Sequence, residues 1–424
     1  MMKKMKLCLP VGWRMIKARY LFRFSRGYTI GRADMGDTGV ACIHYGDIHG
    51  DYHFAIDINT ARLGRIDEPL RFGVSEYVSA GQFLFAGSSE DYEGSGNFTL
   101  IRGNRSAIAG TDTIVLTPYS DMDVDYTAYL FDSLFFREQI RPHMMGTKVF
   151  HPSQKVIKSA WCIVPPQNES RQIVQYLNRE TLWIDGVIEK LRREVELLEQ
   201  YRRELIARTV MRGLDPDVPM RDSGIEWIGE IPEAWALLRI SALYDIRSQK
   251  VNDTDYQPLS VTMNGVVAQL EHVAKTNDGD NRKLVRAGDF VINSRSDRRG
   301  ACGIAPKDGS CSLINIVLSP QQSIHNPYFS YLFRSSLFAD EFYRWGHGIH
   351  DDLWTTNWAD MKSIQVPVPP LNHQVLIADY LDKKMSEINS TITGINNQIE
   401  LLGKYRKQVI NDAVTGKICV EKVA

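Results

Sequence analysis

Two long segments of this chain carry the same heptad pattern of apolar residues, and this duplication limits the possible folds more than any other feature. The C-terminal segment, Val368 to Thr415, opens with a Pro-Pro pair and then has apolar residues three, four or seven positions apart. Such steps place apolar side chains along one side of an α-helix that packs against a partner. The predicted helix-pairing seam consists of Ile184, Ile188, Leu191, Val195, Leu198 and Leu205 in the first copy and Ile388, Ile392, Ile395, Ile399, Leu402 and Val409 in the second.

The two segments align without a gap at a constant offset, since Ile184 and Ile388 differ by 204 residues. Val-Pro-Pro opens both segments, and the dipeptide Tyr201-Arg202 recurs as Tyr405-Arg406. Heptads alone also suit a purely structural coiled coil, so that interpretation stays open on the pattern by itself.

The regions that precede the two helices are related as well. A Pro-x-x-Trp motif occurs at Pro10 to Trp13 and again at Pro232 to Trp235. Matching turns and buried strands are predicted at 80–85 and 287–292 and at 114–118 and 316–320, and matching aromatic helices at 126–140 and 328–342. The sequences between these landmarks differ freely, as expected when two copies of one fold recognise different things.

We therefore predict an α+β fold with an internal repeat and approximate two-fold symmetry. Two mixed α/β domains would be separated by two long helices packed as an antiparallel coiled coil. The predicted boundaries are 1–163 for the first domain, 164–212 for the first helix, 213–234 for a linker rich in Gly, Pro and Asp, 235–367 for the second domain, and 368–424 for the second helix and the C-terminal tail.

Composition limits the broad class. With 424 residues and 43% hydrophobic content, the chain can form two sizeable cores. A formal net charge of -1 does not by itself indicate a nucleic-acid binder. Six cysteines without a C-x-x-C pair suit a reducing cytoplasm. The N-terminal apolar run stops at Pro10, too short for a signal peptide, and no stretch reaches the length of a membrane span. We expect a cytoplasmic protein.

Several motifs in the right order resemble the specificity subunit of type I restriction-modification systems. They are the segment from Asp222 to Pro232 with Trp235, the V-P-P-x-N opening of both helices, the L-L-x-x-Y-R pattern within them, and Ala413 to Lys417 at the end. The sequence departs from the family pattern after the Pro-Pro pairs, at Asn168-Glu169-Ser170 and Asn372-His373-Gln374, and the first copy ends Val210 to Gly213 in place of V-T-G-K.

This resemblance implies a DNA-binding role. The two domains would be target-recognition domains, each reading one half of a bipartite, asymmetric site in double-stranded DNA. The helices would form the spacer and bind two modification (methyltransferase) subunits, and restriction (translocase/nuclease) subunits would add cleavage. The chain itself would bind no cofactor, while the partner methyltransferase would use S-adenosylmethionine.

The helices are long enough for such a spacer. A helix from about residue 170 to residue 210 is ~60 Å long at 1.5 Å per residue. Two such helices held antiparallel would keep two domains apart by more than one turn of B-DNA, ~34–36 Å. Their approximate two-fold axis would match that of the duplex, so each domain could approach its own major groove.

Candidate DNA-contacting residues come from three places. Arg295, Arg298 and Arg299 lie in a loop after a predicted strand, and a glycine-bearing loop occurs at the same place in both copies. The N-terminal segment is rich in arginine. An ordinary solvated surface is the alternative for each of them. The candidates are Lys148, His151, Arg295, Arg298, Arg299, His347, His350, Arg19, Arg23 and Arg26.

Catalytic and metal-binding motifs are weak. Asn326-Pro327-Tyr328-Phe329 is similar to the N-P-P-Y/F loop of amino-methyltransferases, but it lacks the second proline and is better explained as the first turn of a helix. His44, His49 and His53 have the residue type of metal ligands but lie in a region predicted to be strand-like. Neither Cys302 nor Cys311 has a partner for nucleophilic chemistry nearby in sequence. We predict a chain without catalytic or metal residues, the alternatives being a DNA-modifying enzyme (adenine methyltransferase or nuclease) and a structural coiled-coil assembly protein.

Overall fold

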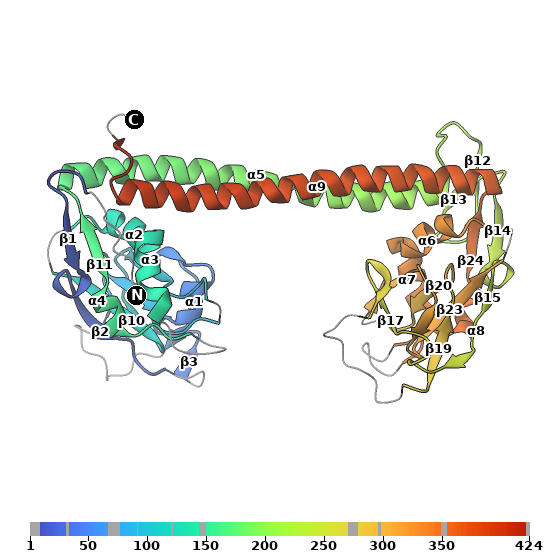
Figure 1. Ribbon diagram of the computed structural model, residues 1–424, viewed down its shortest axis with the longest axis horizontal. Helices are drawn as coiled ribbons and strands as arrows, with labels where there is room; N and C mark the ends of the chain where they lie inside the picture. Colours follow the sequence, from blue (N-terminus) through green and yellow to red (C-terminus); the bar gives the residue numbers. More distant parts are fainter. Residues whose placement is uncertain are drawn as a thin grey trace. The chain divides into compact units, whose positions relative to one another are not determined.

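The computed structural model separates into two compact units (Figure 1). Unit 1 comprises Met1–Lys190 and Asn397–Ala424, and unit 2 comprises Leu191–Asn396. Within them the structure describes residues 9–30, 34–66, 77–90, 92–119, 122–143, 150–269, 279–295, 298–321, 323–348 and 354–420. Both units mix helices with sheets, as predicted.

Unit 1 is built around a mostly antiparallel sheet with the strand order β2-β10-β7-β8-β5. A smaller sheet, β3-β6-β4-β9, and the pair β1-β11 complete the strands. The strands are β1 Arg14–Lys17, β2 Phe22–Arg26, β3 Met35–Gly36, β4 Val40–Ile43, β5 Phe54–Asp57, β6 Arg65–Ile66, β7 Phe83–Ala86, β8 Phe98–Arg102, β9 Ala107–Ala109, β10 Thr113–Pro118 and β11 Trp161–Val164. The short helices are α1 Tyr45–His49, α2 Val124–Asp132, α3 Leu134–Ile140 and α4 Gln154–Ser159.

Unit 2 repeats this plan. Its central sheet has the order β15-β23-β20-β21, and β14-β24 corresponds to β1-β11 of unit 1. The strands are β12 Met220–Asp222, β13 Glu230–Pro232, β14 Ala236–Arg239, β15 Tyr244–Ile246, β16 Lys250–Val251, β17 Leu259–Thr262, β18 Gly265–Ala268, β19 Arg282–Val285, β20 Phe290–Asn293, β21 Cys302–Ile304, β22 Gly309–Cys311, β23 Asn315–Pro320 and β24 Gln365–Val368. The short helices are α6 Asn326–Arg334, α7 Ser336–Arg344 and α8 Trp358–Met361.

The cores of the two units are aromatic and equivalent. Phe131 and Phe136 have ring centroids 4.6 Å apart in unit 1, and Phe333 and Phe338 have the same separation in unit 2. A serine caps the second helix of each pair. Ser133 accepts the backbone N–H of Phe136 in unit 1, and Ser335 accepts that of Phe338 in unit 2. The predicted aromatic helices and the strands that precede them are thus confirmed.

Each core also holds the last turn of the long helix that belongs to the other copy. In unit 1 the Tyr126 hydroxyl donates to the carbonyl of Val414, 3.1 Å away at the end of α9. In unit 2 the Tyr328 hydroxyl donates to the carbonyl of Val210, 2.7 Å away near the end of α5. A helix leaves its last carbonyls without intrahelical partners, so both tyrosines satisfy a group that would otherwise be buried unpaired.

The long helices are α5, Gln167–Arg212, and α9, Leu371–Val414. They lie side by side and antiparallel within each unit (Figure 1). In unit 1, Arg406 Nε lies 2.9 Å from Asp185 Oδ1. In unit 2 the equivalent arginine, Arg202, donates to Asn389 Oδ1 at 3.4 Å. The repeated Tyr-Arg dipeptide thus supplies the same cross-helix contact in both units.

The predicted seam positions are all buried or half-buried along these helices. Ile184 and Ile395, for example, are fully and almost fully buried. A seam requires such burial, and the residue-by-residue pairing stays a prediction.

Two local predictions need comment. Residues 45–49, predicted to be strand-like, form helix α1, because the Asp47 carboxylate accepts the backbone N–H of His44 and caps the first turn. The linker is non-helical, as predicted, and its strands β12 and β13 form a short antiparallel hairpin. Among the residues that the structure describes, no helix is both long and apolar enough to span a membrane.

Candidate nucleic-acid interface

Two of the loops that carry candidate residues meet in unit 2. Thr355 forms antiparallel bridges with both Arg295 and His347. Its backbone N–H and carbonyl are both bonded to His347, each at 3.0 Å, and the N–H of Thr356 donates to the carbonyl of Ser294. The loop after β20 and the loop after α7 therefore form one short, hydrogen-bonded ladder.

Arg295, Arg298 and Arg299 are all exposed at this ladder. Arg299 pairs with Asp340, and its guanidinium lies 5.6 Å from the ring centroid of Tyr343. No side-chain partner is recorded for Arg295 or Arg298 within the described residues. Two cationic forks are thus available to a ligand, while the third holds the loop to α7.

Tyr343 is the main anchor of this loop. Its hydroxyl oxygen lies 3.4 Å from the carbonyl oxygens of both Asn293 and Arg298, which share its single O–H as acceptors. Asn293 is the last residue of β20 and Arg298 lies in the loop that follows, so one buried tyrosine contacts both the start of this loop and its later part. His347 is held in turn by Asp360, whose Oδ1 lies 3.3 Å from its Nε2.

Unit 1 makes the equivalent junction from different residues. Ser89 in the loop after β7 pairs with Phe150 through two backbone hydrogen bonds of 2.9 and 2.7 Å. His151 is exposed there, and its Nδ1 lies 3.3 Å from the carbonyl of Gly87, to which it can only donate. Lys148 and His350 lie outside the described residues, so their assignment stays a prediction.

A polar network lies behind this junction. His49 Nε2 donates to the carbonyl of Ser88 at 2.6 Å, because a carbonyl can only accept. Its Nδ1 then accepts from the Asn97 side chain at 3.1 Å, and Asn97 Oδ1 accepts from Arg137 at 3.0 Å. Both ring nitrogens of His49 therefore have hydrogen-bond partners. Across the described residues, no three His, Cys, Asp or Glu side chains are grouped so as to hold a metal ion.

Asp132 is the most strongly perturbed carboxyl of this region. Burial alone would raise its pKa, but the hydrogen bond with His53 and the charges of Arg137 and Arg406 together hold the pKa well below the usual range. Arg137 Nη2 lies 3.0 Å from the carboxylate, and Arg406 of α9 lies 3.5 Å from it. The network thus ties α9 to the globular part of unit 1.

The N-terminal arginines are spread over different surroundings. Arg19 donates to the carbonyl of Lys158 and to Ser159 Oγ, so it holds the end of α4. Arg23 and Arg26 are exposed on the edge strand β2. Their spacing of three directs them to opposite faces of the strand. They do not form one cluster, and phosphate contact by these residues stays a prediction.

The residues that anchor the two junctions are not equally predictable from the sequence. Thr355 and Phe150 carry no recognisable chemistry, so no sequence signal could have identified them. For Tyr343 the alignment of the two copies is a signal, because it places Tyr343 at the position of Arg141. Arg141 donates from its Nη2 to the carbonyl of Glu93 in the unit 1 loop. The same helical position thus anchors the same loop with a different side chain.

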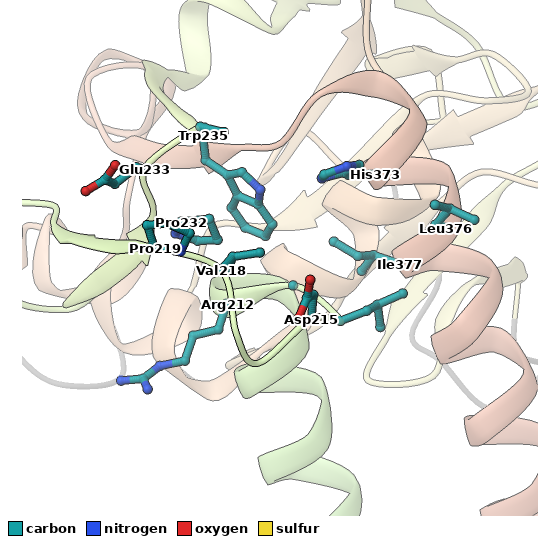
Figure 2. A pocket seen from close by; sticks show the side chains of 13 residues that line it. Arg212, Asp215, Val218, Pro219, Pro232, Glu233, Trp235, His373, Leu376 and Ile377 are labelled. Carbon is teal, nitrogen blue, oxygen red and sulfur yellow. The ribbon is translucent and has the colours of Figure 1, made fainter.

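An apolar pocket of about 640 Å³ lies in unit 2 beside the start of α9 (Figure 2). Trp235, the residue that directly follows the linker, enters it from one side of the pocket lining, and Ile377 and His373 enter it from α9. In unit 1 the equivalent tryptophan, Trp13, instead donates to Glu169 at 2.7 Å. The residue that bonds the tryptophan in unit 1, Glu169, is replaced at the equivalent place in unit 2 by His373, which lines the same pocket as Trp235. The mostly apolar lining suits packing rather than catalysis.

Two of the motifs considered for catalysis have structural explanations. Asn326 and Pro327 form the first turn of α6, and the Asn326 side chain is occupied by Tyr244 and by the carbonyl of Gly288. Burial raises the pKa of the Cys302 thiol to about 12 and that of Cys311 to about 11. A neutral, buried thiol is a poor nucleophile.

Known proteins of one family are similar to this chain in sequence. Residues 240–401 match the family described as "Type I restriction modification DNA specificity domain". The chain is 22% identical over 318 residues to the type I restriction enzyme MjaVIII specificity subunit of Methanocaldococcus jannaschii, covering 70% of this chain and 71% of that protein. It is 24% identical over 210 residues to the EcoKI specificity subunit of Escherichia coli strain K12, covering 45% and 44%.

Solved structures share the fold. A chain from a structure on complex assembly and conformational transition of the type I R-M system matches with a TM-score of 0.70 at 17% identity, over 97% of this chain and 99% of that one. The crystal structure of the HsdS subunit from Thermoanaerobacter tengcongensis matches with a TM-score of 0.53 at 17% identity, over 98% and 100%. The resemblance inferred from the sequence motifs is confirmed.

Proposed function

We propose that the chain is a specificity subunit of a type I restriction-modification system, which reads a bipartite, asymmetric site in double-stranded DNA without catalysing a reaction itself. The globular part of each unit would be a target-recognition domain for one half-site. The domain boundaries are those predicted from the sequence: 1–163 and 235–367 for the two readers.

The observation that carries this proposal is the repeated junction with different side chains. In both units the loop after one central strand, β7 or β20, is joined to the segment that follows the pair of short helices. The joining bridges are Ser89 with Phe150 and Arg295 with Thr355. One scaffold thus presents two different surfaces. That is the arrangement expected of two readers with different sequence preferences.

The helices α5 and α9 would act as an antiparallel coiled-coil spacer. The matching contacts of Arg406 with Asp185 and of Arg202 with Asn389 support a single register along both helices. At 1.5 Å per residue, the 46 residues of α5 correspond to ~69 Å of helix. A rigid element of this length can fix the gap between two half-sites.

The same helices offer sites for the partner subunits. Leu197 and Tyr201 on α5 are each 49% exposed, and the equivalent Leu401 and Tyr405 on α9 are 63% and 49% exposed. Exposed apolar pairs of this kind, one turn apart, are typical of protein-binding surfaces. Two equivalent pairs suit two methyltransferase subunits. S-adenosylmethionine would be used by those subunits, and restriction subunits would join where the system includes them.

Exchange of one reader tests the proposal. Residues 236–357 would be replaced by the corresponding segment of a specificity subunit with a different target, and the chain expressed with its methyltransferase subunits in a host lacking such modification. Methylome sequencing should show a motif altered in one half only, because the other reader is unchanged. The reverse exchange, of the first reader, is the matched control.

An unaltered motif after the exchange would contradict the proposal and favour a purely structural role. Methylation of specific DNA by the purified chain with S-adenosylmethionine alone would contradict the non-catalytic assignment.

A further inference from the structure

We propose that Arg295 is the residue with which unit 2 reads a guanine in its half-site, and that Arg299 positions the loop that carries it. This inference rests on the proposed function, since it assigns a base to one of the two readers.

The backbone of Arg295 is fixed on both sides. Its N–H donates to Asn293 Oδ1 at 3.0 Å, and it forms an antiparallel bridge with Thr355. The preceding residue, Ser294, is almost fully buried and accepts from the N–H of Thr356. Reading a base edge requires a donor held close to its productive position, and this backbone provides such support.

Of the three arginines of the loop, Arg299 is engaged, and Arg295 and Arg298 are available. Arg299 is paired with Asp340 and lies over the ring of Tyr343. Arg295 is exposed, and within the described residues no acceptor is recorded for its guanidinium. Arg295 thus keeps its planar fork of donors for a ligand.

The corresponding loop of unit 1 argues for a base rather than a phosphate. Residues 88–97 contain no Arg or Lys and include Glu90 and Glu93. If this loop only held the DNA backbone, both copies would need cations there, because carboxylates repel phosphates. A difference in charge at one place on a shared scaffold is expected of residues that read sequence. Among bases, guanine offers the O6 and N7 acceptors that arginine contacts in bidentate fashion.

The test uses the chain with its methyltransferase subunits in a host that lacks the modification, read out by methylome sequencing. R295A should relax one position of the motif, in the half assigned to unit 2 by exchange of residues 236–357. Discrimination for guanine there should fall about 5-fold to 150-fold, and the other half should be unchanged. R295Q should shift that position toward adenine, because glutamine can contact adenine N6 and N7.

R298A is the matched control, since Arg298 lies in the same loop with the same charge and exposure. It should lower methylation at all target sequences about equally and leave the motif intact. The inference is overturned if R295A and R295Q keep the guanine, if both lower methylation uniformly, or if R298A relaxes the motif instead. A wild-type chain that supports no bipartite methylated motif would refute the proposed function itself, which separates the two outcomes.

Discussion

At the scale of single residues, the two copies keep a contact while changing its chemistry. In unit 1, Gln82 donates to Thr117 Oγ1 at 2.9 Å and so links the turn before β7 to β10. In unit 2 the same place holds Asp289, which accepts from Arg247 at 2.6 Å, while Arg247 also donates to Ser319. A neutral link and a charged link therefore do the same structural work. At such positions, residue identity does not reveal that the two units are equivalent, whereas the pattern of hydrogen bonds does.

The network around Asp132 leads to a prediction about stability. The Asp132 side chain is largely buried, at 12% exposed, and forms ion pairs with Arg137, His53 and Arg406. Asp132→Asn should destabilise the chain by about 3–5 kcal/mol near neutral pH, because it leaves the buried Arg137 guanidinium without its carboxylate. Urea unfolding, followed by fluorescence, measures the difference. Asp340→Asn, which removes an exposed partner of Arg299, is the control and should cost less than about 1 kcal/mol.

The Asp132 carboxyl also makes the difference in unfolding free energy between the wild type and Asp132→Asn depend on pH. The folded-state pKa of Asp132 lies below the ordinary value of 3.8. Its stabilising contribution is therefore fully present above that value and is lost as pH falls through the folded-state pKa. The free-energy gap between the wild type and Asp132→Asn should narrow below about pH 4. A gap that stayed constant from pH 7 to pH 3 would show that the charge of Asp132 contributes nothing.

At the scale of elements, the sequence was most informative where a pattern is local and repeated. The apolar spacing of α5 and α9 predicts each helix, and Asn326-Pro327 predicts the start of α6. The strand-like prediction for residues 45–49 is wrong because it rests on Gly46 and Gly50, which are typical of a broken strand. The contact that favours helix α1 is the hydrogen bond from the His44 backbone N–H to the Asp47 carboxylate. Short helices are decided by such caps more than by composition.

The paired helices lead to a further prediction about stability and partner binding. Ile395→Asn places an amide at a position that is 6% exposed, where its polar groups lack partners. The loss should be at least ~1–3 kcal/mol, from the unpaired polar group. Copurification of tagged chain with its methyltransferase subunits should fall in parallel, because the docking surface depends on the pair. Ser390→Asn, at an exposed position of the same helix, is the control. Full copurification with Ile395→Asn would separate docking from helix pairing.

At the scale of the whole molecule, the duplication was the decisive clue and the sites were the least predictable part. The loops bearing Arg295 and His347 could each be singled out as polar and basic. Their meeting at Thr355 could not, because it depends on bridges between segments far apart in the sequence. The same holds for Asp132, whose partners His53 and Arg406 come from distant segments. Fold follows from repeated local patterns, while a site follows from tertiary contacts that leave no periodic trace.

The spacer role makes a prediction about the entire assembly. Insertion of seven residues into α5 near Leu191, together with seven into α9 near Asn397, would keep the heptad register and add ~10.5 Å of helix. This corresponds to about three base pairs at ~3.4 Å each. Methylome sequencing should therefore show loss of methylation at the original gap, with any remaining modification at a longer gap between unchanged half-sites. Insertion into α5 alone breaks the register and should abolish modification. If the original gap were still methylated after the paired insertion, the helices would not set the spacing.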